Sequence, residues 1–164
     1  MNNIVVLLLS SALVMSSAMA AEAVIKWTEP DEYTDIRAGD NHRKHFREQL
    51  FNNVEKHVSK LASRLPEKQL LIIEVTNIDL AGTTLHTGLN RIRVIKETYP
   101  PRMNFSYQLV NVDKSLVMEG KANLINMNFM MSKRIKYQTD TLGHEKTMLD
   151  KWFAQTFKSM LDNK

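Results

Sequence analysis

Two amphipathic helical segments bracket a series of short, strand-like segments, and this arrangement limits the folds open to the chain. From about residue 41 to residue 65, apolar residues recur at intervals of three and four, and Pro66 ends the pattern. A second stripe with the same spacing runs from about residue 142 to residue 161. Each helix must bury one face, so we expect the segments between them to form a sheet that both helices cover.

The segments outside the helices show the apolar runs and the alternation that are typical of strands. A short strand is predicted at residues 24–27, and residues 70–76 are apolar on both faces, which favours a central strand. Residues 104–110 alternate between apolar and polar side chains. A predicted turn at residues 112–115 leads into a strand over residues 116–124. The predicted order is therefore β-α-β-β-β-α.

The fold class that follows is α+β, a single domain with a mainly antiparallel sheet and two amphipathic helices packed on one face. Residues 77–88 are predicted to be a turn region, residues 91–94 a short alternating segment, and residues 125–131 a further extended run. A change of apolar phase at Leu124 and Ile125 predicts a β-bulge there.

Residues 1–20 are predicted to be a secretory signal peptide. An uncharged apolar core ends in Ala18-Met19-Ala20, an A-x-A site typical of cleavage after the last alanine. Serines and small residues in this stretch, without flanking basic residues, favour cleavage over a retained membrane anchor. We expect a periplasmic protein in which residues 21–164 form the single domain, with no stable membrane insertion after cleavage.

The chain contains no cysteine, so an exported domain of this kind must be stable through packing alone. The absence of thiols excludes thiol catalysis and cysteine-ligated zinc or iron–sulfur sites. Glycine-rich nucleotide fingerprints, a serine nucleophile elbow and the H-E-x-x-H zinc motif are also missing. The net charge of +4 is too small to argue for nucleic-acid binding. No cofactor is expected, and the sequence favours a protein that is not an enzyme.

Charge is distributed unevenly along the chain. Residues 21–36 hold five acidic residues and one lysine, a net charge of −4, whereas residues 37–64 hold seven basic and three acidic residues, a net charge of +4. The favoured interpretation is that the acidic arm lies near the basic helix, or that both segments are simply solvated. The alternative is a basic face that binds an anionic component of the cell envelope.

The start of the first helix contains candidate binding residues. Arg43 and Lys44 lie in its first turn, where the helix dipole disfavours cations. Free N–H groups beside these two residues and His42 would suit a phosphate or a carboxylate. His42 and His45 are three residues apart and could face one metal ion, although an exposed helix end is the favoured interpretation.

Three methionines, Met127, Met130 and Met131, surround Phe129. Thioethers are soft ligands that suit Cu(I), which makes a copper carrier one alternative. In a strand, however, Met127, Phe129 and Met131 would share one face, so burial against a helix is the favoured interpretation.

Several landmarks follow one another in a fixed order along the chain. They are Trp27 with Pro30, Tyr33-Thr34-Asp35-Ile36, Leu65-Pro66 at the end of a helix, residues 71–82, Tyr99-Pro100-Pro101-Arg102 and residues 145–152. Together they resemble an uncharacterised family of exported proteobacterial proteins, catalogued as a domain of unknown function (DUF3016). The resemblance covers essentially the whole chain after residue 20. It implies a periplasmic address and one compact α+β domain, and it implies no activity.

Polar residues on rigid turns beside the sheet are the candidate site of such a domain. Asp79 follows a buried strand, Asp35 lies before the first helix, and Tyr99 and Arg102 flank two prolines. The candidate binding residues are Asp35, Asp79, Tyr99, Arg102, Arg43 and Lys44. The alternative is that Arg102 pairs with Asp35 or Asp79 and pins loops together.

The sequence thus favours an exported, non-catalytic protein that binds an envelope protein or an anionic ligand. One alternative is a small hydrolase-type enzyme in which Asp35 and Asp79 act as acid and base. Another is a metal carrier that uses methionine and histidine. No residue is assigned to catalysis or to a metal.

Overall fold

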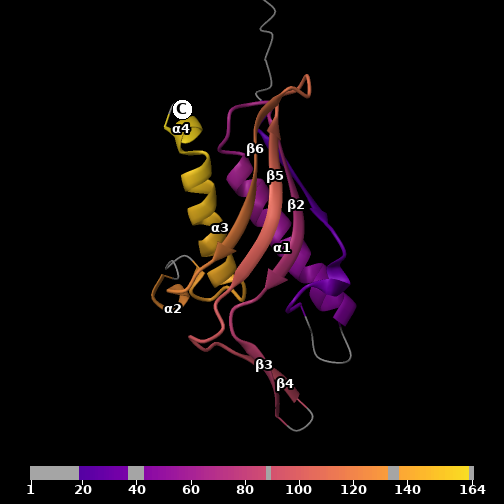
Figure 1. The fold of residues 1–164 in the computed structure, drawn as a ribbon, viewed down its shortest axis with the longest axis vertical. Helices are drawn as coiled ribbons and strands as arrows, with labels where there is room; N and C mark the ends of the chain where they lie inside the picture. The colour runs from indigo at the N-terminus through magenta and orange to yellow at the C-terminus, as the bar shows by residue number, and fades with distance from the viewer. Residues whose placement is uncertain (1–18, 37–42, 88–89, 133–136, 163–164) are drawn as a thin grey trace, which may run out of the picture.

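The centre of the fold is a four-stranded sheet, seen in a computed structural model (Figure 1). The structure describes residues 19–36, 43–87, 90–132 and 137–162. β1 (Glu22–Trp27) is parallel to β2 (Leu70–Asp79). β5 (Arg102–Val110) is antiparallel to β2 and to β6 (Leu116–Ile125), which gives the strand order β1-β2-β5-β6. The sheet is mainly antiparallel, as the sequence predicts.

Of the two long helices, α1 (Arg43–Ala62) crosses behind this sheet in Figure 1, and α3 (Gly143–Thr156) lies at its left, beside β6. Both were expected from the spacing of their apolar residues. Helix α3 ends at Thr156, before the predicted end at residue 161. Phe157 caps it, and the chain then forms a separate short helix, α4 (Lys158–Leu161). A turn of 3₁₀ helix, η1 (Pro30–Glu32), lies between β1 and α1.

Aromatic side chains join both helices to the same face of the sheet. The register pairs Trp27 with Val75 and Val75 with Phe105, so these three side chains leave the sheet on one side. Trp27 stacks on Phe51 of α1 with a ring-centroid distance of 3.9 Å, and Phe105 meets Trp152 of α3 edge to face at 4.8 Å. The prediction that both helices cover one face is confirmed.

A second, two-stranded sheet lies where the sequence predicts turns, so the prediction for residues 77–88 is wrong. β2 continues to Asp79, and β3 (Thr83–Thr87) pairs with β4 (Asn90–Val94) in a separate antiparallel hairpin. The β-branched threonines of β3 suit a strand, and their pairing with β4 outweighs the turn signal of the neighbouring glycine, Gly82.

The extended run predicted for residues 125–131 is also wrong. β6 ends at Ile125, and the chain then turns into α2 (Phe129–Ser132). The N–H of Phe129 donates to the carbonyl of Asn126 at 3.2 Å and closes this turn. The bulge predicted at Leu124 and Ile125 is absent from the described ladder. Its register shifts lie elsewhere, between Val75 and Asn77 and between Leu109 and Val110.

This turn reverses the prediction that the methionines are core residues. Met127, Met130 and Met131 are 62%, 50% and 93% exposed, whereas Phe129 is fully buried. Residues three and four apart share one side of a helical turn, so the three methionines point outward together while Phe129 points inward. The strand periodicity assigned to this segment therefore placed the wrong residues in the core.

The predicted signal peptide lies almost entirely outside the described residues, which begin at Met19. Within the part of the chain that the structure describes, no helix has both the length and the apolar character needed to span a membrane.

Candidate functional site

Three of the residues nominated from the sequence lie close together at one end of the sheet. Asp35 forms an isolated bridge with Asp79 at the end of β2, and Arg102 is the cross-strand neighbour of Asp79 on β5. Arg93, on β4, donates from Nη1 to Oδ2 of Asp35 at 2.7 Å. Burial, followed by the charge of Asp35, raises the pKa of Asp79, and the two arginines oppose this shift.

This charge cluster fastens separate segments of the chain to one another. The N–H of Asp35 donates to the carbonyl of Ile78 at 3.2 Å, and Nη1 of Arg93 also donates to the carbonyl of Ala81 at 3.3 Å. The loop before α1 and the β3–β4 hairpin are thereby tied to the end of β2. The sequence interpretation named Arg102 as the arginine that pins these loops together, whereas the ion pair in the structure joins Arg93 to Asp35.

Tyr99 contributes to this region through its main chain. Its carbonyl accepts the N–H of Gly82 at 2.9 Å, and its side chain is 46% exposed. Pro100 and Pro101, which follow it, are buried and lead directly into β5. Tyr99 therefore holds the corner that carries Gly82.

The candidate anion site at the start of α1 is only partly described. Lys44 is exposed and lies 3.9 Å from Glu48, one helical turn away. The side chain of Arg43, and His42 with the rest of residues 37–42, lie outside the described residues. The ring of His45 is hydrogen-bonded to Gln49 at 2.9 Å. The anion site and the His42–His45 metal site stay predictions. The described residues hold no group of three or more histidine, aspartate or glutamate side chains placed around one metal ion.

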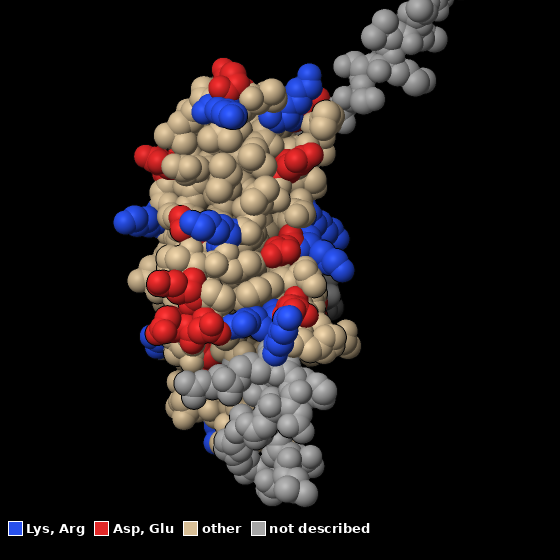
Figure 2. Space-filling view, turned by 90° about the vertical axis from the view of Figure 1, so that its right-hand side faces the viewer, with Lys and Arg blue, Asp and Glu red and all other residues tan. Residues whose placement is uncertain are grey.

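The acidic arm does lie against the basic helix. Asp31 forms an ion pair with Arg47 of α1, and Nε1 of Trp27 donates to Glu55 of α1 at 2.8 Å. Figure 2 shows acidic and basic side chains interspersed on the side of the molecule that lies at the right in Figure 1. Acidic and basic side chains are mixed on that face, which shows no single basic surface.

A cavity of about 210 Å³ lies beside the charge cluster, where four parts of the chain meet. Its wall comes from α1, the corner after β2, β4 and the beginning of α3. The lining residues are Phe46, Gln49, Leu50, Asn53, Leu80, Ala81, Arg93, Thr141, Leu142 and Glu145. Most of this wall is apolar, with Arg93 and Glu145 as its charged residue types.

Glu145 lies in the first turn of α3 and is only 4% exposed. Oε1 of Glu145 accepts the N–H of Ala81 at 2.8 Å, and the carbonyl of Ala81 accepts a hydrogen bond from Arg93. The main chain of Ala81 thus holds both side chains at the cavity. Burial raises the pKa of Glu145, although the N–H of Ala81 and the charge of Arg93 favour the ionised form.

Two buried atoms at this cavity have no hydrogen-bond partner among the described residues. They are Nη2 of Arg93 and Oε2 of Glu145. A buried polar atom left unpaired costs about 1–3 kcal/mol, and folded proteins satisfy nearly all of them. Both atoms belong to residues that line the cavity, so two side chains at its wall keep unused hydrogen-bonding capacity.

Sequence reasoning nominates neither of these two residues. Arg93 is placed by its alternation only on the wetter face of a strand, and Glu145 attracts notice only through an incomplete zinc motif, His144-Glu145. The one available signal is an acidic side chain in the first turn of an otherwise apolar helix face. That pattern is common at helix starts, so it does not single out Glu145.

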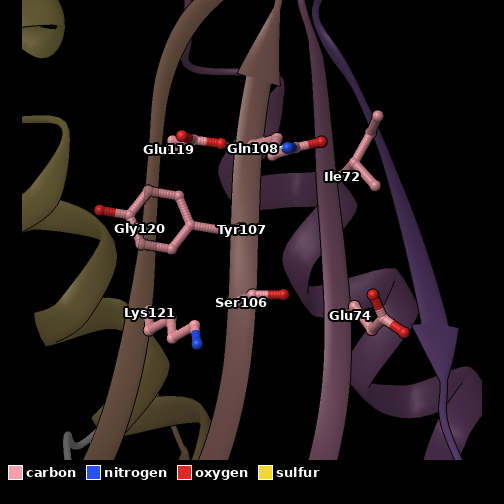
Figure 3. Close-up of a pocket in the computed structure, with 8 residues that line it drawn as sticks. All are labelled: Ile72, Glu74, Ser106, Tyr107, Gln108, Glu119, Gly120 and Lys121. Carbon is pink, nitrogen blue, oxygen red and sulfur yellow. Dashed lines mark hydrogen bonds between the residues drawn. The ribbon is translucent and has the colours of Figure 1, made fainter.

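A broader concavity of about 480 Å³ lies on the open face of the sheet (Figure 3). It is lined by Ile72, Glu74, Ser106, Tyr107, Gln108, Glu119, Gly120 and Lys121. Glu74 accepts from Lys26 at 2.9 Å and from Thr28 at 2.8 Å, and Gln108 donates to Glu119 at 3.1 Å. An antiparallel sheet commonly has one face in water, and this concavity lies on that face. Its carboxylates already have hydrogen-bond partners, so the smaller cavity is the better candidate site.

Comparison with known proteins gives one family match. Residues 21–155 match a family described as "Protein of unknown function (DUF3016)". The matched region contains the four-stranded sheet, α1, nearly all of α3 and both cavity residues with unpaired atoms. No curated protein and no solved structure matches the chain. The chain belongs to the DUF3016 family of proteins of unknown function.

Proposed function

We propose that this domain is a non-catalytic binding protein that takes a small, partly apolar ligand into the cavity between α1, β4 and α3. The observation that carries the proposal is the pair of buried, unpaired atoms, Nη2 of Arg93 and Oε2 of Glu145. Ligand pockets are typically apolar with a few placed polar groups, and this wall has that composition.

An acid–base reaction by Asp35 and Asp79 has less support. Such a pair needs a carboxyl group that can reach the substrate. Asp35 is bonded to Arg93, and neither aspartate is among the residues that line the cavity. The pair is better suited to holding the wall of the cavity in place.

The change Gln49→Trp is expected to weaken ligand binding at least about tenfold. Gln49 is exposed on α1 and lines the cavity, so an indole at this position narrows the cavity without disturbing the core. Binding is measured by NMR or calorimetry on the purified protein, with a panel of small carboxylic acids, amides, amines, alcohols and phosphates.

The matched control is Gln155→Trp, since Gln155 is exposed on α3 and is not a lining residue. This variant is expected to bind as the parent protein does. A panel in which nothing binds the parent protein, or a Gln49→Trp variant that binds with unchanged affinity, contradicts the proposed function.

The working compartment in this proposal is the periplasm, after removal of residues 1–20. Its support is the A-x-A site at Ala18 and Ala20, together with a family match that starts at residue 21 and a first strand that starts at Glu22. The protein from a periplasmic fraction is expected to begin at Ala21 by intact mass.

Ala18→Arg removes the small side chain that the cleavage site requires and is expected to leave the uncleaved chain as the main product. A parent protein that keeps Met1, or that stays in the cytoplasmic fraction, contradicts this part of the proposal.

A further inference from the structure

The polar group of the ligand follows from the two unpaired atoms, and this inference rests on the proposed function. We propose that the ligand is a short monocarboxylate whose carboxylate lies between Nη2 of Arg93 and Oε2 of Glu145. A carboxylate is planar and carries two acceptor oxygens. One accepts the N–H of Arg93, and the other accepts a proton held on Glu145.

The surroundings of Glu145 favour a protonated side chain. The charged and polar groups around it are Arg93 from β4, the N–H of Ala81 from the corner after β2, Asp140 before α3, its helix neighbour Lys146, and the neutral amides Gln49 and Asn53 from α1. Lys146 is already bonded to Asp140 at 2.5 Å and to Asn53 at 3.3 Å. Burial is the largest influence on Glu145 and raises its pKa. The wall then presents an O–H and an N–H, which are both donors.

The formal charges beside the cavity balance one another before a ligand binds. Asp35 and Asp79 formally cancel Arg93 and Arg102, so the region carries no net charge while Glu145 is protonated. A carboxylate accepting from a guanidinium makes a charge-assisted hydrogen bond, the stronger kind. An ammonium group would instead meet two donors, and its own protons would find no acceptor there.

The rest of the wall limits the size of the ligand. A volume of about 210 Å³ is below the range of roughly 300–1,000 Å³ that is common for ligand pockets. Phe46, Leu50, Leu80 and Leu142 provide apolar contacts for a short hydrocarbon tail. Hexanoate, with six carbons, is therefore the probe, and hexanamide and hexylamine match its length with different polar groups.

Hexanoate is expected to bind the purified protein at least about tenfold more tightly than hexanamide or hexylamine near pH 6. Because its carboxylate shares the proton of Glu145, the affinity is expected to fall about tenfold for each pH unit above the pKa of Glu145. Calorimetry in buffers of different ionisation enthalpy measures both the affinity and the protons taken up.

Two conservative variants test the roles of the two side chains. E145Q keeps an oxygen for the N–H of Ala81 and places an N–H donor where the protonated acid has its O–H. It is expected to bind hexanoate within about threefold of the parent near pH 6, with the pH dependence lost. R93K keeps a cation for Asp35 but lacks the second guanidinium nitrogen, so about a tenfold loss of hexanoate affinity is expected.

A measurement without ligand reports on the same proton. At a pH between the two pKa values, the folded protein would keep a proton on Glu145 that the unfolded chain has released, since burial raises the folded-state pKa. The parent protein is therefore expected to lose stability as pH rises from the unfolded pKa of 4.5 through the folded pKa. E145Q is expected to lack this part of the decline, as measured by denaturant unfolding across that pH range.

The two proposals fail in different ways. If hexanamide or hexylamine binds as tightly as hexanoate and Gln49→Trp still blocks binding, the cavity is a ligand site but the carboxylate is the wrong head group. The inference is also overturned if E145Q abolishes hexanoate binding near pH 6, because Glu145 would then act as an ionised acceptor. If no compound of the wider panel binds, the proposed function falls as well.

Discussion

Replacement of Trp152 by alanine is expected to lower the free energy of unfolding by about 3–5 kcal/mol. Trp152 is 7% exposed on α3 and meets the rings of Phe105, Tyr107 and Phe157 at centroid distances of 4.8, 5.4 and 5.8 Å. These contacts join α3 to the sheet, and edge-to-face aromatic pairs add to the burial of apolar area. Since the chain has no cysteine, no disulfide compensates for the cavity that alanine leaves.

Denaturant unfolding, followed by circular dichroism, measures this loss. Met131→Ala is the control, because Met131 is a large apolar side chain that is 93% exposed. That variant is expected to unfold within about 0.5 kcal/mol of the parent. A loss below about 1 kcal/mol for Trp152→Ala would mean that the aromatic cluster does not hold α3 to the sheet.

Gly82→Ala is expected to cost about 3 kcal/mol or more, for two reasons that add. Gly82 has a φ of +83°, a conformation in which a side chain is strained. A Cβ at this position would lie 2.4 Å from the carbonyl oxygen of Val94 and 2.9 Å from Cα of Ile95. Both are main-chain atoms, so the β3–β4 hairpin would have to move away from the corner.

Gly120→Ala is the matched control for this change. A Cβ there would meet the hydroxyl oxygen of Tyr107 at 2.7 Å, which is the far end of a side chain that can shift. Its cost is expected to be smaller, about 1 kcal/mol. Equal losses in the two variants would contradict the argument from backbone strain.

Gly82 follows Ala81, whose main chain holds Arg93 and Glu145 at the cavity. A folded Gly82→Ala protein is therefore also expected to bind the ligand more weakly. Gly120 lies in the middle of β6 and does not line the cavity, so Gly120→Ala is expected to bind the ligand normally. Both variants are compared at a temperature where each is fully folded, so that stability and binding are separated.

The spacing of apolar residues along the chain was enough to predict those elements that have a regular apolar period. Helix α1 is recognisable because its apolar residues repeat at intervals of three and four and Pro66 follows. The same reasoning failed at β3 and at the methionine turn. In these two places the structure depends on contacts with other segments. Residues Thr83–Thr87 pair with β4, and the ring of Phe129 packs against the ring of His144.

Some residues of the candidate site could likewise be nominated from the sequence, and others could not. Asp35, Asp79 and Arg102 could be nominated from the sequence because each is a polar residue at a strand end or rigid turn, and the structure brings them together. Arg93 and Glu145 could not, because their importance comes from burial and from contacts with a distant main chain. Ala81 and Glu145 are 64 positions apart in the sequence.

By itself, the amino-acid sequence determined the class of the fold, the sheet face that both helices cover and the dependence of stability on packing without disulfides. These properties follow from residue type and period, which are local. Only the tertiary structure decided where polar atoms would be buried without partners, because that depends on which segments meet. In this protein α1, the corner after β2, β4 and α3 meet around one small cavity, and the bonds from Ala81 leave Nη2 of Arg93 and Oε2 of Glu145 unpaired in its wall.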